Sequence, residues 1–174
     1  MKFMRVVAIV LALLVAGTLS AGCTVNKSFP YFSQCDSRWS TDKLGTLTIC
    51  QKGSLMCSVA SGMAGLGMLI YDQPVTPQNL NSFLMQNGGY NSDNLYVWST
   101  VERFGLRYEG QTSDKSQIKK NICDNKLVFL QINYVQWVLA KGYDNDTFYV
   151  NDPVSKKSTF SSISVTRAAA YAVL

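Results

Sequence analysis

The chain of 174 residues carries 16 basic and 11 acidic side chains, a net charge of +5, and 47% of its residues are hydrophobic. This charge is mild and scattered, so we expect no nucleic-acid partner and no binding to a charged membrane surface. The chain contains no histidine, which excludes a Cys-His or Ser-His-Asp mechanism and any histidine-based metal site for the chain acting alone. We expect neither a cofactor nor a bound metal.

The first 22 residues have the pattern of a secretory signal peptide. A basic start precedes the apolar run VVAIVLALLVAG, which is too short to span a bilayer, and small residues follow it. Cleavage near Ala21 or Gly22 would remove two basic residues, leaving one secreted or extracytoplasmic domain, 23–174, with a net charge of +3 and no membrane span. Two alternatives stay open: a permanent membrane anchor, and a lipoprotein signal, SAGC, that would attach lipid to Cys23.

Five cysteines remain in the mature chain: Cys23, Cys35, Cys50, Cys57 and Cys123. In an oxidising compartment, pairing into disulfides is the expected state. Cys35 and Cys50 flank a short loop, and we expect them to pair. Cys57 and Cys123 are the candidates for a second bridge, and the odd count leaves one cysteine free, lipidated or bound to another chain.

Helical periodicity dominates the first half of the mature chain. Apolar residues recur at helical spacing over 54–71, which predicts a central helix buried on most sides. Its glycines, each costing a helix about 1 kcal/mol relative to alanine, indicate where another element approaches closely. The stretch TPQNLNSFLMQNGGY predicts a second helix with Thr76 as its cap and Pro77 at its first position. Two further helices are predicted within 93–105 and, capped near its first residue, 113–125.

The second half of the chain is rich in β-branched and aromatic residues. The segments KLVFLQINY, QWVLAKGYD and TFYVNDP predict three strands, and YDNDT predicts a hairpin turn between the last two. The stretch ISVTRAAAYAVL adds a closing strand. Helices followed by an antiparallel sheet indicate an α+β domain.

Three stretches carry a resemblance to a known family. FPYFSQCDSRW contains Gln34, Asp36 and Trp39; TICQKGSLMCS contains Thr-Ile, three residues and Gly-Ser-x-x-Cys-Ser; and QWVLAKGYDNDTFYVNDP contains Gly-Tyr-Asp and Asn-Asp-Pro. In this order, together with the helix TPQNLNSFLMQNGGY, they resemble the bacteriocin-processing (double-glycine leader) peptidase-like domains, which belong to the papain-like cysteine peptidases. The likeness covers roughly 29–153 and implies a papain-like fold.

The resemblance implies a role for four residues of this chain. The family's nucleophilic cysteine follows the glycine of the second motif, where this chain has Ser54, and Cys57 takes the family's Ser/Thr position. The family's histidine precedes Trp-Val, where this chain has Gln136. Asp152 matches the acid that orients the histidine, and Gln34 matches the glutamine that stabilises the oxyanion. The supporting residues are retained, while those that attack and transfer the proton are replaced.

These replacements indicate a catalytically inactive homologue. A serine hydroxyl needs a base to become a nucleophile, and a glutamine amide accepts no proton in the relevant pH range. The former cleft would then bind an extended peptide or a cell-wall peptide, bounded by Gln34, Trp39 and Trp137. The alternative for both tryptophans is a place in the core. Ser54 is also a good helix-capping residue, and Gln136 is also a hydrogen-bond partner for Asp152 or Ser54.

Two other functions stay open. One is an active cysteine peptidase or hydrolase that uses Cys57 with a base other than histidine. The other is a disulfide-stabilised extracellular structural module that binds no peptide.

Overall fold

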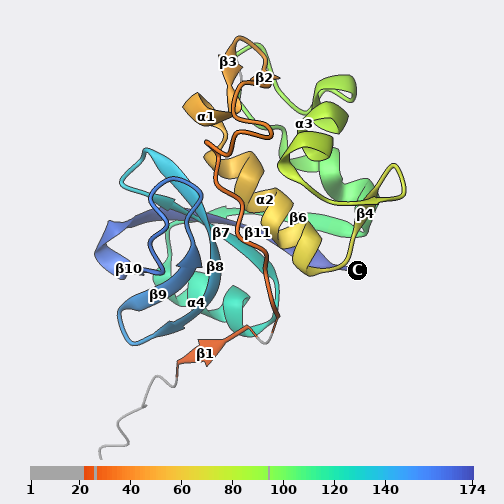
Figure 1. Ribbon diagram of the computed structural model, residues 1–174. Coiled ribbons are helices and arrows are strands. Elements are labelled where there is room, and N and C mark those ends of the chain that lie inside the picture. The colour runs from red at the N-terminus through yellow and green to blue at the C-terminus, as the bar shows by residue number, and fades with distance from the viewer. Residues whose placement is uncertain (1–21, 26, 94) are drawn as a thin grey trace, which may run out of the picture.

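The computed structural model describes residues 22–25, 27–93 and 95–174. The predicted signal peptide, apart from Gly22, lies outside these residues. Within them, no helix is long and apolar enough to cross a bilayer. A helical part packs against one face of a seven-stranded sheet (Figure 1). This mixture of helices and strands agrees with the predicted α+β class.

The elements of the helical part lie between Lys43 and Phe104. It consists of α1 (Ile49–Lys52), α2 (Ser54–Gly65), α3 (Pro77–Gln86), the 3-10 helix η1 (Trp98–Phe104), and two hairpins, β2 (Lys43–Leu44) with β3 (Leu47–Thr48) and β4 (Leu69–Ile70) with β5 (Gln73–Pro74). The two hairpins and the single turn α1 are not predicted from the sequence, because each is too short to show a period.

Helix α2 is shorter than the predicted helix over 54–71. It ends at Gly65, and Gly67 takes a φ of +71°, which turns the chain into the β4–β5 hairpin. A Cβ atom at Gly62 would lie 3.2 Å from Leu127 of the sheet, and one at Gly65 would lie 2.3 Å from the Phe29 ring. These glycines allow the close approach that their place in the sequence predicts.

Helices α3 and α4 (Lys115–Cys123) begin where local signals place them, within one residue. Thr76 caps α3 through the backbone N–H of Asn79, whose side chain bonds back to Thr76. Asp114 caps α4, one residue after the predicted cap at Ser113. The predicted helix over 93–105 is reduced to the 3-10 helix η1, which ends at Gly105 with a φ of +81°.

The sheet is antiparallel in every pairing, with the strand order β10-β9-β8-β7-β11-β6 and β1 paired to β8. Its strands are β1 (Cys23–Thr24), β6 (Leu106–Thr112), β7 (Leu127–Ile132), β8 (Gln136–Asp144), β9 (Thr147–Asn151), β10 (Thr159–Ser161) and β11 (Val165–Val173), with the short 3-10 helix η2 (Ser162–Ser164) before the last. The three central strands and the closing strand were predicted. Strand β6 was not, because only Leu106 of its seven residues is buried.

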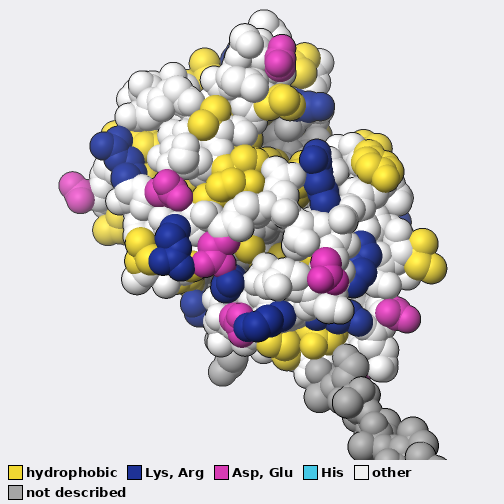
Figure 2. All heavy atoms as spheres, turned by 180° about the vertical axis from the view of Figure 1, so that it is seen from behind, with side chains coloured by type: hydrophobic (Ala, Val, Ile, Leu, Met, Phe, Trp, Pro, Cys, Tyr) yellow, Lys and Arg dark blue, Asp and Glu magenta, His cyan; other side chains and the backbone are white. Residues whose placement is uncertain are grey.

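Two hydrophobic cores lie on opposite faces of the sheet. All six residues of β7 are buried, and successive side chains of a strand point to opposite faces. Leu127 and Phe129 therefore pack in the core that contains α2, while Val128 and Leu130 pack in the core that contains Ile118 of α4. On the outer surface seen from behind, basic and acidic side chains are interspersed (Figure 2).

The disulfides differ in part from the prediction. The structure contains the predicted bridge between Cys35 and Cys50, but Cys123 bonds Cys23. The predicted bridge between Cys57 and Cys123 is wrong, because Cys57 lies in the α2 core and Cys123 ends α4 on the other face of the sheet. A sulfur atom in a disulfide cannot also carry a lipid thioether, so the Cys23 bridge and lipidation of Cys23 exclude each other.

Replacing both Cys23 and Cys123 by serine is expected to lower the free energy of unfolding by about 5 kcal/mol, because this bridge closes a loop of 100 residues. The same change at Cys35 and Cys50, whose loop spans 15 residues, should cost about 3 kcal/mol. Urea unfolding without reductant measures both. An unchanged free energy of unfolding for the first variant would contradict the Cys23–Cys123 bridge.

Candidate functional site

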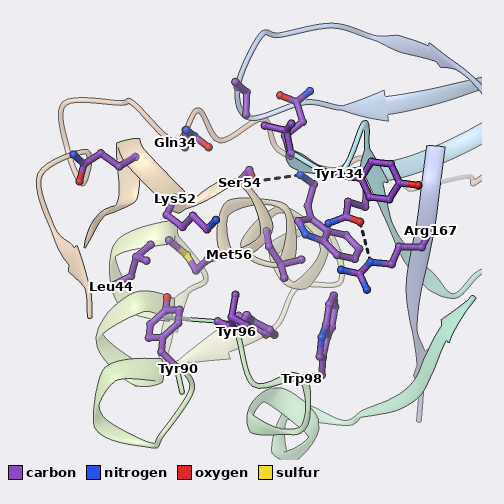
Figure 3. Close-up of a pocket in the computed structure, with 18 of the residues that line it drawn as sticks. Gln34, Leu44, Lys52, Ser54, Met56, Tyr90, Tyr96, Trp98, Tyr134 and Arg167 are labelled. Carbon is purple, nitrogen blue, oxygen red and sulfur yellow. Dashed lines mark hydrogen bonds between the residues drawn. The ribbon is translucent and has the colours of Figure 1, made fainter. Parts of the chain in front are cut away.

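A pocket of about 600 Å³ opens between the helical part and one end of the sheet (Figure 3). Its walls come from α1 and α2, from the segment that leads into η1, and from strands β6, β7, β8 and β11. Six amide side chains line it: Gln34, Gln51, Asn91, Gln111, Gln131 and Gln136. Five aromatic side chains line it as well: Tyr90, Tyr96, Trp98, Tyr134 and Trp137. Its polar lining is therefore made mostly of uncharged hydrogen-bonding groups.

Ser54 lies at the floor of this pocket as the first residue of α2. The chain turns from α1 into α2 at Gly53, where a Cβ atom would lie 2.5 Å from the Ile49 carbonyl oxygen. Only glycine tolerates such an approach. The N-cap position of α2 is occupied by Gly53, and Ser54 is the first residue inside the helix. Ser54 therefore does not cap the helix.

The Ser54 hydroxyl instead joins α2 to the sheet. Its Oγ accepts a hydrogen bond of 3.2 Å from the backbone N–H of Trp137, while Ser58, one helical turn further on, donates to the Trp137 carbonyl oxygen at 3.2 Å. Strand β9 pairs with β8 only from Leu139 onward, so the two serines hold the backbone of Trp137 where β9 does not reach. Buried backbone groups need such partners.

Gln136 and Asp152 meet beside this junction. The Gln136 Nε2 atom donates a long hydrogen bond of 3.5 Å to the Asp152 carboxylate. Asp152 is completely buried, and it also accepts from the backbone N–H of Val154 at 2.9 Å and of Ser155 at 3.3 Å, and from the Ser155 hydroxyl. The turn after β9 therefore holds the carboxylate in place behind Gln136.

Gln34 reaches the same end of the pocket from the N-terminal segment. Its backbone N–H donates to the Pro153 carbonyl at 3.0 Å, and its Nε2 donates to the Cys50 carbonyl at 2.6 Å. The side chain is 8% exposed, and its Oε1 atom has no hydrogen-bond partner among the described residues. Gln34 thus holds a buried acceptor without a bond beside the pocket.

The two tryptophans predicted to bound the cleft have different places. Trp137 lines the pocket. Trp39 does not: it is 2% exposed, its ring packs edge-on against Phe32 at 5.8 Å, and its indole N–H donates to the Ser33 carbonyl at 2.8 Å. Trp39 therefore packs in the core and does not bound the pocket, as the alternative interpretation had it.

Cys57 lies outside the pocket. It is fully buried in the α2 core, and burial raises the pKa of its thiol well above the usual range. A nucleophilic cysteine needs the opposite, a thiolate that a substrate can reach. The geometry gives no support to the alternative in which Cys57 is the nucleophile.

Sequence reasoning missed several residues of this site. Trp98 of η1 meets Trp137 at 5.4 Å between ring centroids and stacks on Tyr108 at 5.3 Å. Gln131 and Arg167 complete the wall formed by the sheet. One signal was present: Gln131 is the only polar residue in the otherwise apolar strand LVFLQI. Among the described residues, no group of three or more histidine, cysteine or acidic side chains could hold a metal ion.

Of three comparisons with known proteins, one found a match. No protein-family model and no curated protein matches the chain. A solved structure does, that of a double glycine motif protease from an AMS/PCAT transporter in complex with the leader peptide. The match has a TM-score of 0.56 at 14% identity and covers 87% of this chain and 94% of that one. At this identity the likeness shows a shared fold, so the chain has a peptidase-like fold.

Native protein treated with iodoacetamide at pH 8 without reductant is expected to leave Cys57 unlabelled, because its thiol is buried and protonated. The same treatment in urea should label Cys57 alone, since the other four cysteines are bridged. Mass mapping after an acid quench distinguishes the two results. Rapid labelling of Cys57 in the folded protein would contradict the structure and revive a thiol mechanism.

Proposed function

We propose that the chain is a peptide-binding domain with a peptidase-like fold and no peptidase activity of its own. The observation that carries this proposal is the pair of residues at the floor of the pocket. Ser54 stands at the start of α2 with its hydroxyl bonded to a backbone N–H, and Gln136 stands beside it with its amide bonded to Asp152. The arrangement keeps a peptidase frame and lacks a group that could take a proton from Ser54.

The hydrogen bonds argue against serine chemistry in particular. A catalytic serine donates its proton to a base, and none of the hydrogen bonds of the described residues joins the Ser54 hydroxyl to one. Lys52 and Arg167 are the charged groups of the pocket, and both are cations. A serine without a general base has the weak nucleophilicity of an ordinary alcohol.

The pocket has the features that an extended peptide needs. Apolar side chains surround its opening and are largely exposed: Leu95 at 51%, Tyr134 at 81%, Val135 at 80% and Val154 at 45%. Such side chains would cover apolar residues of a ligand. The solved peptidase of similar fold was crystallised with a leader peptide, which supports peptide binding as the retained function.

Secretion belongs to the same proposal. Two disulfides form in the structure, and such bridges persist in oxidising compartments. The predicted signal peptide would bring the domain there. A purely structural module remains the alternative function, and it differs from our proposal in binding no peptide.

The double variant Ser54→Cys, Gln136→His is expected to contain an activated thiol. A cysteine at the start of α2 gains from the positive end of the helix, and an imidazole held by Asp152 would stabilise the thiolate further. Iodoacetamide labelling rates against pH give the thiol pKa, which should lie below the ordinary value of about 8.5 and below that of the single variant Ser54→Cys. Equal values in the single and double variants would show that residues 54 and 136 do not act together.

Exposed apolar residues at the opening offer a test of peptide binding. An array of capped hexapeptides is expected to retain the labelled wild-type protein, and the variant Leu95→Ser, Val135→Ser should bind the retained peptides at least about fivefold more weakly. Ile163→Ser is the matched control, because Ile163 is 92% exposed and lies outside the pocket. An array that retains no wild-type protein would favour the structural module, and equal losses in both variants would exclude this pocket as the site.

A further inference from the structure

The charges of the pocket are all of one sign. Lys52, at the end of α1, and Arg167, on β11, enter it from opposite sides (Figure 3). None of the aspartates and glutamates among the described residues lines it. Elsewhere on the described chain, many cations have carboxylate partners, as in the pairs Arg38–Asp36, Arg107–Glu109 and Lys120–Asp124. The face seen in Figure 2 likewise mixes both signs.

Arg167 is held in a definite orientation by its neighbours. Arg167, Gln131 and Trp137 are cross-strand partners on the adjacent strands β11, β7 and β8, so they form one row on one face of the sheet. The Arg167 Nε atom donates to the Gln131 Oε1 at 2.8 Å, and the guanidinium lies 5.7 Å from the centroid of the Trp137 ring. Gln131 is only 7% exposed, and its Oε1 also accepts from the Thr166 hydroxyl at 3.1 Å.

A bulge in β11 contributes to this orientation. The register of β11 against β7 shifts between Val165 and Arg167. Bulges of this kind redirect a side chain next to a binding site. The Nε atom of Arg167 is taken up by its hydrogen bond to Gln131. The two terminal amino groups of the guanidinium have no acceptor among the described residues.

We propose that this pocket selects peptides that carry a carboxylate, which Arg167 binds through its two terminal amino groups, and this selection rests on the peptide-binding function proposed above. A planar guanidinium matches a carboxylate with two parallel hydrogen bonds, and its Nε bond to Gln131 leaves both of those donors available. Lys52 contributes a second positive charge that attracts the carboxylate to the pocket, but it does not bind the carboxylate directly. The carboxylate is either an acidic side chain or the free C-terminus of the peptide.

A peptide array with matched charges tests this selection. Capped hexapeptides with one position fixed as Glu are compared with the same sequences carrying Gln, and amidated peptides are compared with their free acids. Titrations of the retained peptides are followed by tryptophan fluorescence, because Trp98 and Trp137 line the pocket. We expect the wild-type protein to bind one of the two carboxylate forms at least about tenfold more tightly than its neutral match, with a preference that weakens as salt is added. The arm that shows the preference identifies the source of the carboxylate.

Variants assign the preference to one residue. Arg167→Gln should remove the preference for the carboxylate while the neutral peptides still bind, whereas Arg107→Gln should keep it, because Arg107 is an exposed arginine of β6 that pairs with Glu109 outside the pocket. Arg167→Lys keeps the charge without the planar fork and should keep only part of the preference. Equal binding of charged and neutral peptides by the wild-type protein, or a preference that survives Arg167→Gln, would overturn the proposal. Failure of every peptide to bind would overturn the peptide-binding function as well.

Discussion

The backbone of Trp137, held between two serines of α2, is the contact on which the site depends. Ser54 accepts from its N–H and Ser58 donates to its carbonyl, each at 3.2 Å. This clamp joins the first turn of the central helix to the one stretch of β8 that β9 leaves unpaired. It sets the distance between the helical part and the sheet at the floor of the pocket. Ser54 takes part in it only as an acceptor, through its Oγ atom.

The buried carboxylate of Asp152 has a comparable structural role. The backbone N–H groups of Val154 and Ser155 hold it, and so do the hydroxyl of Ser155 and the amide of Gln136. A buried charge that keeps all of these partners is stabilised, and removing them would leave it unpaired. The Gln136 amide therefore serves as one of the hydrogen-bond donors to the buried carboxylate. The polar groups around Asp152 therefore bind one another.

Local patterns predicted the longer helices and four of the strands, and motif order placed three polar residues together. The caps of α3 and α4 are local signals, and the alternating strands are local as well. The convergence of Gln34, Ser54 and Gln136 at one pocket follows from the order of the three motifs. Contacts between distant segments were not predictable in this way. The Cys23–Cys123 bridge depends on β1 lying beside β8, and the sequence shows nothing of that pairing.

The pocket residues that were missed share a physical reason. Arg167 and Gln131 become neighbours only through the register of β11 on β7, which includes a bulge. Trp98 reaches the site through a 3-10 helix whose period differs from the predicted α-helix. Trp39 was misplaced for the converse reason, because a tryptophan in a family motif is compatible with both a core and a cleft. Register and packing, rather than residue type, decide such cases.

The central claim is that the pocket binds peptides and does not cleave them. The most direct test incubates a defined peptide mixture with the wild-type protein and with Ser54→Ala. Mass spectrometry follows the mixture over time and identifies the peptides that co-purify with the protein. Our account predicts that peptides co-purify with the wild-type protein and that no cleavage product accumulates with either protein. Products that form with the wild-type protein and disappear with Ser54→Ala would contradict it, because Ser54 would then be a nucleophile served by a base other than histidine.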